Sequence, residues 1–139
     1  KIEQIIEEGQ ALKHCLDRSD RYFERIANQE SYIVFLRRTK AMEQPYYTLE
    51  IEPDGTTRQK RTVGDNQNND YHRAEKFLKK WQAAIRPRLS QEDFERQEIS
   101  RQLRMYELES LRNDKVTVHG GIHAGELLAD ILEADLMEA

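Results

Sequence analysis

The sequence has little cysteine and no long apolar run. Cys15 is the single cysteine, which excludes an intramolecular disulfide. No stretch approaches the roughly 20 apolar residues that a membrane-spanning helix needs, and the N-terminus lacks the basic and then apolar build of a secretory signal. We therefore expect a cytoplasmic protein that has no membrane partner.

Familiar catalytic and nucleotide-binding motifs are absent as well. The sequence contains no phosphate-binding loop, dinucleotide fingerprint, CxxC pair or serine nucleophile elbow, so it assigns no cofactor. The first residues, KIEQII, lack an initiator methionine and are typical of the middle of a helix, so we expect a fragment of a longer chain.

The 139 residues, 35% of them charged, suffice for one modest core, but their charges are unevenly distributed. Residues 56–88 carry nine Lys or Arg and three acids, whereas residues 120–139 carry five acids and no Lys or Arg. A basic segment in an acidic protein is a candidate surface for phosphate groups, and an acidic one repels them. The predicted nucleic-acid contacts are Arg58, Lys60, Arg61, Arg73, Lys76 and Lys80.

Three β-rich stretches, YIVFLRR, PYYTLEIE and TRQKRTV, follow one another after Ser31 and predict an antiparallel meander. In the second stretch Tyr47, Leu49 and Ile51 alternate with polar residues, so one face of that strand is apolar. In the third, Gln59 and Arg61 alternate against Arg58 and Lys60, and neither face is strongly apolar. This pattern predicts a strand at the sheet edge.

Helical periodicity surrounds the strands. A helix from Ser19 to about Asn28 precedes them, and a helix over 71–85 should cover the apolar face of the sheet and end before Pro87. Ser90 and Asp93 predict the capping box of a long charged helix to about Arg112, whose thin apolar stripe favours projection from the domain or packing on another chain. An acidic helix closes the chain.

We therefore predict an α+β fold: a small antiparallel sheet of three to four strands packed by helices, with the long charged helix and the acidic C-terminal helix after it. Composition divides the chain into a core domain, residues 1–88, and a helical extension, residues 89–139, for interactions.

His14 and Cys15 stand side by side in KHCL. A neighbouring imidazolium or a helix N-terminus lowers the pKa of a thiol and makes it reactive. A lone cysteine is also commonly a small buried apolar residue. Both interpretations stay open on spacing alone.

Polar residues on the strands form a second candidate site. In a meander Thr48 and Glu50 share one sheet face, Gln59 and Arg61 of the next strand can align with them, and Arg37 lies on the first strand. Arginine could bind an anion there and a carboxylate could act as a base. The alternative is a solvated face with cross-strand ion pairs.

The stretch VHGGIHAGE offers His119, His123 and Glu126 as metal ligands. Gly120 and Gly121 favour a turn and remove the helical spacing of a metalloprotease motif. We therefore prefer a turn that leads into the acidic helix, and we assign no metal site.

The order of these motifs resembles the PcfJ-like proteins of conjugative plasmids and prophages. The likeness covers about residues 7–82: EGQALKHCL, Tyr22 and Arg25, YIVFLRR, PYYTLEIEPDGTTRQKR, a loop with Gly64 and Asn66, and KFLKKW. Leu16 and Asp17 stand where that family typically has valine and glycine. The resemblance places His14, Cys15, Arg37, Thr48, Glu50 and Gln59 on the family's polar positions and implies one site, without supplying a reaction.

Three functions remain open. The first is a mobile-element protein that acts on or with nucleic acid through the basic segment. The second is an enzyme with a His-Cys, Arg and Glu site for phosphoryl transfer, nucleotide-linked group transfer or nuclease chemistry. The third is an adaptor that binds a protein partner or a second copy of itself through residues 90–139.

Overall fold

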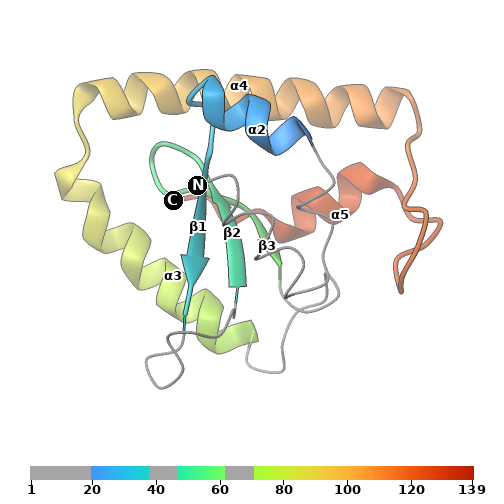
Figure 1. Cartoon of the computed structure of the whole chain (residues 1–139), viewed down its shortest axis with the longest axis horizontal. Helices are drawn as coiled ribbons and strands as arrows, with labels where there is room; N and C mark the ends of the chain where they lie inside the picture. Colours follow the sequence, from blue (N-terminus) through green and yellow to red (C-terminus); the bar gives the residue numbers. More distant parts are fainter. Residues whose placement is uncertain (1–19, 38–46, 62–70) are drawn as a thin grey trace.

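The computed structural model describes residues 20–37, 47–61 and 71–139. It confirms the α+β class: a three-stranded sheet with helices around it (Figure 1). The elements, in chain order, are α2 (Asp20–Ala27), β1 (Tyr32–Leu36), β2 (Tyr47–Ile51), β3 (Thr57–Arg61), α3 (Tyr71–Ile85), the 3-10 helix η3 (Arg86–Arg88), α4 (Gln91–Asn113) and α5 (Leu128–Asp135). Within these residues, no helix is both long and apolar enough to cross a membrane.

The sheet is the predicted antiparallel meander, in the order β1-β2-β3. Glu50 pairs with Gln59 and Ile51 pairs with Thr57, so Arg58 is an extra residue on β3. Such a bulge redirects a side chain. Strict alternation placed Arg58 on the face of Lys60, but its guanidinium instead contacts Glu52 and comes within 3.9 Å of Glu50 on the polar side.

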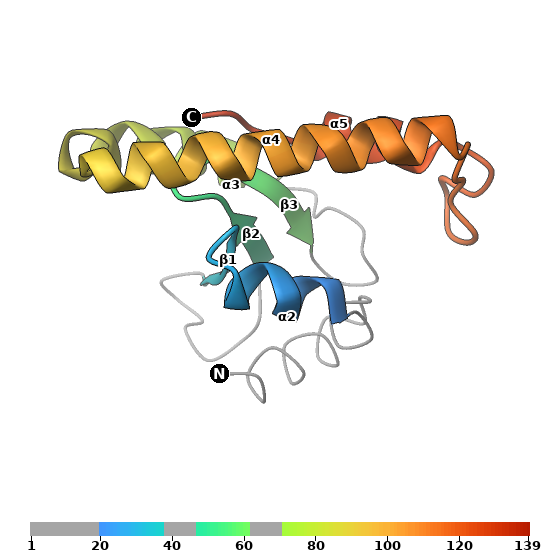
Figure 2. The same ribbon diagram turned by 90° about the horizontal axis from the view of Figure 1, so that it is seen from above.

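The core lies on the apolar face of β2, as predicted. Tyr47, Leu49 and Ile51 pack against Ala74 and Leu78 of α3. Figure 2 shows α3 and α2 on opposite sides of the sheet. The helix ends at Ile85, and η3 carries Pro87 in its first turn, where a missing N–H costs little.

Gly55 joins β2 to β3 in a turn that only glycine fits. Its φ is 95°, and a Cβ there would lie 2.8 Å from Cδ1 of Ile85. The left-handed backbone disfavours any other side chain. The turn therefore fixes the separation between the strands and the end of α3.

The long helix α4 does not project from the domain, contrary to expectation. It runs across the end of the sheet where β2 ends and β3 begins (Figure 1), and Gln97, Ser100 and Arg104 contact residues there. The capping box is confirmed: Ser90 Oγ accepts from Asp93 N at 3.1 Å, and Asp93 Oδ2 accepts from Ser90 N at 2.8 Å. That backbone bond from Ser90 lowers the pKa of the Asp93 carboxyl.

The C-terminal segment covers part of the outer edge of β3. Thr57 and Met137 exchange two backbone hydrogen bonds, both 2.8 Å, and the Met137 side chain is buried in the core. On α4, Arg112 lies 2.6 Å from Asp130 and 2.8 Å from Glu133 of α5. Residues 89–139, expected as an extension, therefore pack onto the sheet.

Candidate functional site

Glu50 is the centre of the polar face. It is 2% exposed, and its carboxylate accepts hydrogen bonds from Ser31 Oγ at 2.6 Å and from Arg25 Nη1 at 2.8 Å to each oxygen. Gln59 Nε2 lies 3.4 Å away, across the strand pair. Three side chains, from α2, from β3 and from the residue before β1, thus converge on this one carboxylate through hydrogen bonds, two of them from the charged Arg25 guanidinium.

Glu52 directly follows the last residue of β2, and its carboxylate lies on the same side as that of Glu50. Arg58 Nε lies 2.5 Å and Arg104 Nε 2.7 Å from its Oε2. Gln97 Nε2 donates to its Oε1 at 2.8 Å. Two arginines from different elements, β3 and α4, thus converge on one fully buried carboxylate.

These groups form one buried ion network that joins α2, the sheet and α4. Arg25 bridges Glu50 and Glu107, and Arg58 also binds Glu30 and Ser100. A buried charge is tolerated when opposite charges and hydrogen bonds surround it. In the described part of the chain, the network joins three arginines to four glutamates that are buried or largely buried: Arg25, Arg58, Arg104, Glu30, Glu50, Glu52 and Glu107. Arg104 also lies 3.6 Å from the exposed Glu138.

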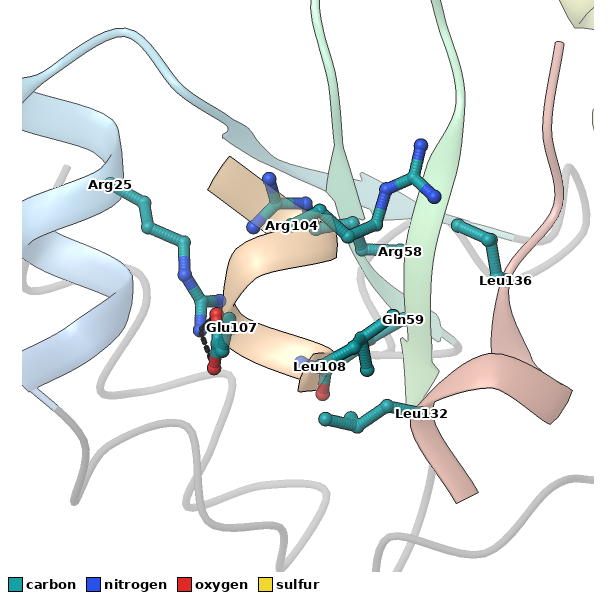
Figure 3. A pocket seen from close by; sticks show the side chains of 8 residues that line it. All are labelled: Arg25, Arg58, Gln59, Arg104, Glu107, Leu108, Leu132 and Leu136. Carbon is teal, nitrogen blue, oxygen red and sulfur yellow. Dashed lines mark hydrogen bonds and ion pairs between the residues drawn. The ribbon is translucent and has the colours of Figure 1, made fainter. Parts of the chain in front are cut away.

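A small cavity lies beside the network (Figure 3). Its volume is about 30 Å³, enough for one or two water molecules. Arg25 and Glu107 face each other on one side of it, and Leu108 and Leu132 lie near Gln59 on another. A nucleotide or peptide does not fit this space. The network therefore holds helices on the sheet, and its carboxylates are occupied by arginines.

The structure brings together part of the predicted polar set. Glu50 and Gln59 are in contact, and Thr48 lies buried on the same face. Arg37 does not clamp Glu50; its guanidinium carbon lies 5.5 Å from the centre of the Phe35 ring. His14 and Cys15 lie outside the described residues.

Of the seven charged residues of the network, the sequence predicted only Glu50 as part of a polar site. Arg58 was predicted as a surface contact, and the others were missed: Arg25, Glu30, Glu52, Arg104 and Glu107. One signal was available on α4, because Gln97, Ser100 and Arg104 recur at the spacing of one helix face. Ile99, Leu103 and Tyr106 recur on another face of that helix, and they are exposed.

Two residues that were predicted to contact nucleic acid, Arg58 and Lys60, are buried and therefore cannot form a surface for it. Arg58 is bound in the network, and Lys60 is fully buried, with its Nζ donating to the backbone oxygen of Asp135 at 2.8 Å. Arg61 ends β3, and its side chain lies outside the described part of the chain. Arg73, Lys76 and Lys80 are exposed on α3, as expected.

The outer side of α3 and η3 forms a basic face. It comprises six cations: Arg73, Lys76, Lys79, Lys80, Arg86 and Arg88. Residues 71–88 contain one acid, Glu75. Ala74 and Leu78 face the core, so the cations lie on the opposite side of the helix.

The stretch VHGGIHAGE forms a turn, as expected, and the residues on either side of it, Thr117 and Leu127, form an antiparallel bridge. His123 Nδ1 lies 2.6 Å from Glu126 Oε2, and both side chains are about half exposed. Among the described residues, no group of three or more His, Cys, Asp or Glu side chains is arranged to hold a metal ion.

Comparison with known proteins gives one result. A family model described as PcfJ-like protein matches residues 1–76. No curated protein and no solved structure gives a significant match. The matched part contains α2, the whole sheet and the start of α3, and so it includes Arg25, Glu50, Arg58 and Gln59 of the network.

Proposed function

This chain belongs to the PcfJ-like protein family, and we propose that it serves a conjugative plasmid or prophage in the cytoplasm by binding nucleic acid through the basic face of α3 and η3. The observation that carries the proposal is the exposure of six cations, four on α3 and two on η3, while the inner side of α3 is fixed in the core.

These cations are available to an external anion. Within the described ranges, no ion pair involves Arg73, Lys76, Lys79, Lys80 or Arg88. By contrast, the arginines of the ion network are each held by glutamates. None of the acids in the described ranges forms an ion pair with these five cations of α3 and η3.

The acidic part of the protein lies elsewhere. In Figure 1, α5 lies beyond the β3 edge of the sheet, whereas the middle of α3 lies toward the β1 edge. Its acids, Asp130 and Glu133, are engaged with Arg112 of α4. The C-terminal segment meets α3 on its inner side, where Gln82 Nε2 donates to the Met137 backbone oxygen at 3.0 Å. The outer side of α3 is therefore open to nucleic acid without contact with Asp130 or Glu133, which would repel phosphates.

The charge reversal Lys80→Glu should weaken binding of a labelled DNA duplex about tenfold, because one phosphate contact is lost. The slope of log affinity against log salt concentration should become less steep by about one. Fluorescence anisotropy over a range of salt concentrations measures both quantities. The matched control is Arg101→Glu, the same charge change on exposed α4, where Arg101 lies 3.5 Å from Glu98. If wild type binds no nucleic acid at low salt, or if both variants lose affinity equally, the proposal fails.

A second candidate function, self-association through residues 90–139, is favoured by the outer side of α4. Ile99 is 62% and Leu103 45% exposed, one turn apart, and Tyr106 on the next turn is exposed as well. The sedimentation coefficient of the wild type should then rise with protein concentration. That of Ile99→Lys should stay at the value of the monomer. A wild-type coefficient that stays monomeric up to high protein concentration would exclude this candidate.

A further inference from the structure

We propose that the basic face of α3 prefers single-stranded nucleic acid, with Phe77 as the platform on which a base stacks. This inference rests on the proposed function and assigns its ligand class. Phe77 is 53% exposed, although its neighbour Leu78 is buried in the core. The ring thus stands among the cations of the outer face.

The position of Phe77 on the helix supports this role. Residues three and four apart are neighbours on a helix surface. Arg73 therefore precedes Phe77 by one turn, and Lys80 and Trp81 follow it by one turn. Proteins that bind single strands combine cations that follow the phosphates with aromatic rings that stack on bases.

The core does not require Phe77. Ala74 and Leu78 supply the buried contacts of this part of α3, and Trp81 packs partly against the same cluster. An exposed large aromatic is unfavourable in water unless something covers it. An unpaired base offers a flat apolar surface, whereas the bases of a duplex are already stacked.

A membrane surface suits this helix less well. Interfacial helices insert a continuous apolar face between lipid headgroups. The apolar face of α3 is occupied by β2, so one ring remains for contact with lipid. The flanking cations match a phosphodiester chain that lies along the helix.

Intrinsic fluorescence provides a direct measurement, because Trp81 is the single tryptophan of the chain and lies one turn from Phe77. We titrate the protein with oligothymidylate, oligouridylate and a DNA duplex, and with vesicles of anionic phospholipid. Oligothymidylate or oligouridylate should quench Trp81 at lower concentration than the duplex does. The comparison of the two single strands distinguishes DNA from RNA.

Phe77→Leu keeps an apolar side chain but removes the ring. It should weaken binding of single strands about fivefold or more, the usual effect of losing one stacked base, and leave duplex binding unchanged. Tyr106→Leu, which removes an exposed ring on α4, is the matched control and should change neither affinity. Far-UV circular dichroism checks that both variants are folded.

The outcomes separate this inference from the proposed function. If single strands and duplex bind equally and Phe77→Leu has no effect, the preference is wrong but nucleic-acid binding stands. If the protein binds neither, or binds only the vesicles, both proposals fail. Equal losses for single strand and duplex in Phe77→Leu also overturn the stacking role, because they indicate a general effect on α3.

Discussion

Glu52→Gln should lower the free energy of unfolding by about 3–5 kcal/mol, measured by urea denaturation at constant pH. The substitution keeps the shape of the side chain but removes the charge between Arg58 and Arg104. Two guanidinium groups then remain at a site from which water is largely excluded. Losses of this size are a large part of the stability of an ordinary domain.

The matched control is Glu92→Gln at the start of α4. Glu92 forms an ion pair with Arg96 at 2.7 Å, but its side chain is 68% exposed. Surface pairs of this kind contribute about 0–1 kcal/mol because water screens them. Equal effects of the two substitutions would contradict the view that the network holds α4 on the sheet.

The network also explains how a sheet with a polar face can be buried. An apolar layer between α4 and the sheet would have achieved the same contact without desolvating any charge. Ionic groups instead require specific partners at specific distances, as Arg58 and Arg104 show at Glu52. We infer that the network fixes the register of α4 along the end of the sheet, a role that buried polar groups serve in some proteins.

Much of the fold was predictable because local patterns agree with it. Alternation marked β2, Pro87 marked the end of α3, and Ser90 with Asp93 marked the start of α4. Each of these signals depends on residues within a few positions of one another. Such patterns describe an element without saying which of its faces is buried.

The orientation of α4 was not predictable by the usual rule. That rule turns the apolar stripe of a helix inward. Here Ser100 and Arg104 face the sheet, whereas Ile99 and Leu103 are exposed to solvent. The polar residues face inward because the side of the sheet that α4 contacts is itself polar. The error came from treating the sheet face that carries Glu50 as a solvated or catalytic surface.

The candidate site was predictable only in part. Glu50 and Gln59 are nine residues apart on paired strands, and a meander brings them together. Arg25 and Glu107 are 82 residues apart, and no local pattern connects them. The position of Arg58 depends on a bulge, which the alternation of its neighbours does not reveal.

Lys60 and Asp135 form a buried ion pair outside the network, and they join β3 to the C-terminal segment. Lys60 is fully buried; its Nζ lies 3.5 Å from Asp135 Oδ1, and its backbone N–H donates to Oδ2 at 3.0 Å. Asp135→Asn retains an acceptor for that N–H but removes the carboxylate. We expect it to lower the free energy of unfolding by about 3 kcal/mol or more.

Adding Lys60→Met to Asp135→Asn should recover part of this loss, because the double variant no longer buries an ammonium group beside an amide. The two effects are therefore expected to be non-additive by about 1 kcal/mol or more, measured by urea denaturation of the four proteins of the cycle. Amide exchange at Thr57 and Met137, whose backbones pair, should accelerate in Asp135→Asn more than in the double variant. Simple additivity, with exchange at these two amides unchanged, would show that the pair does not hold the C-terminal segment on β3.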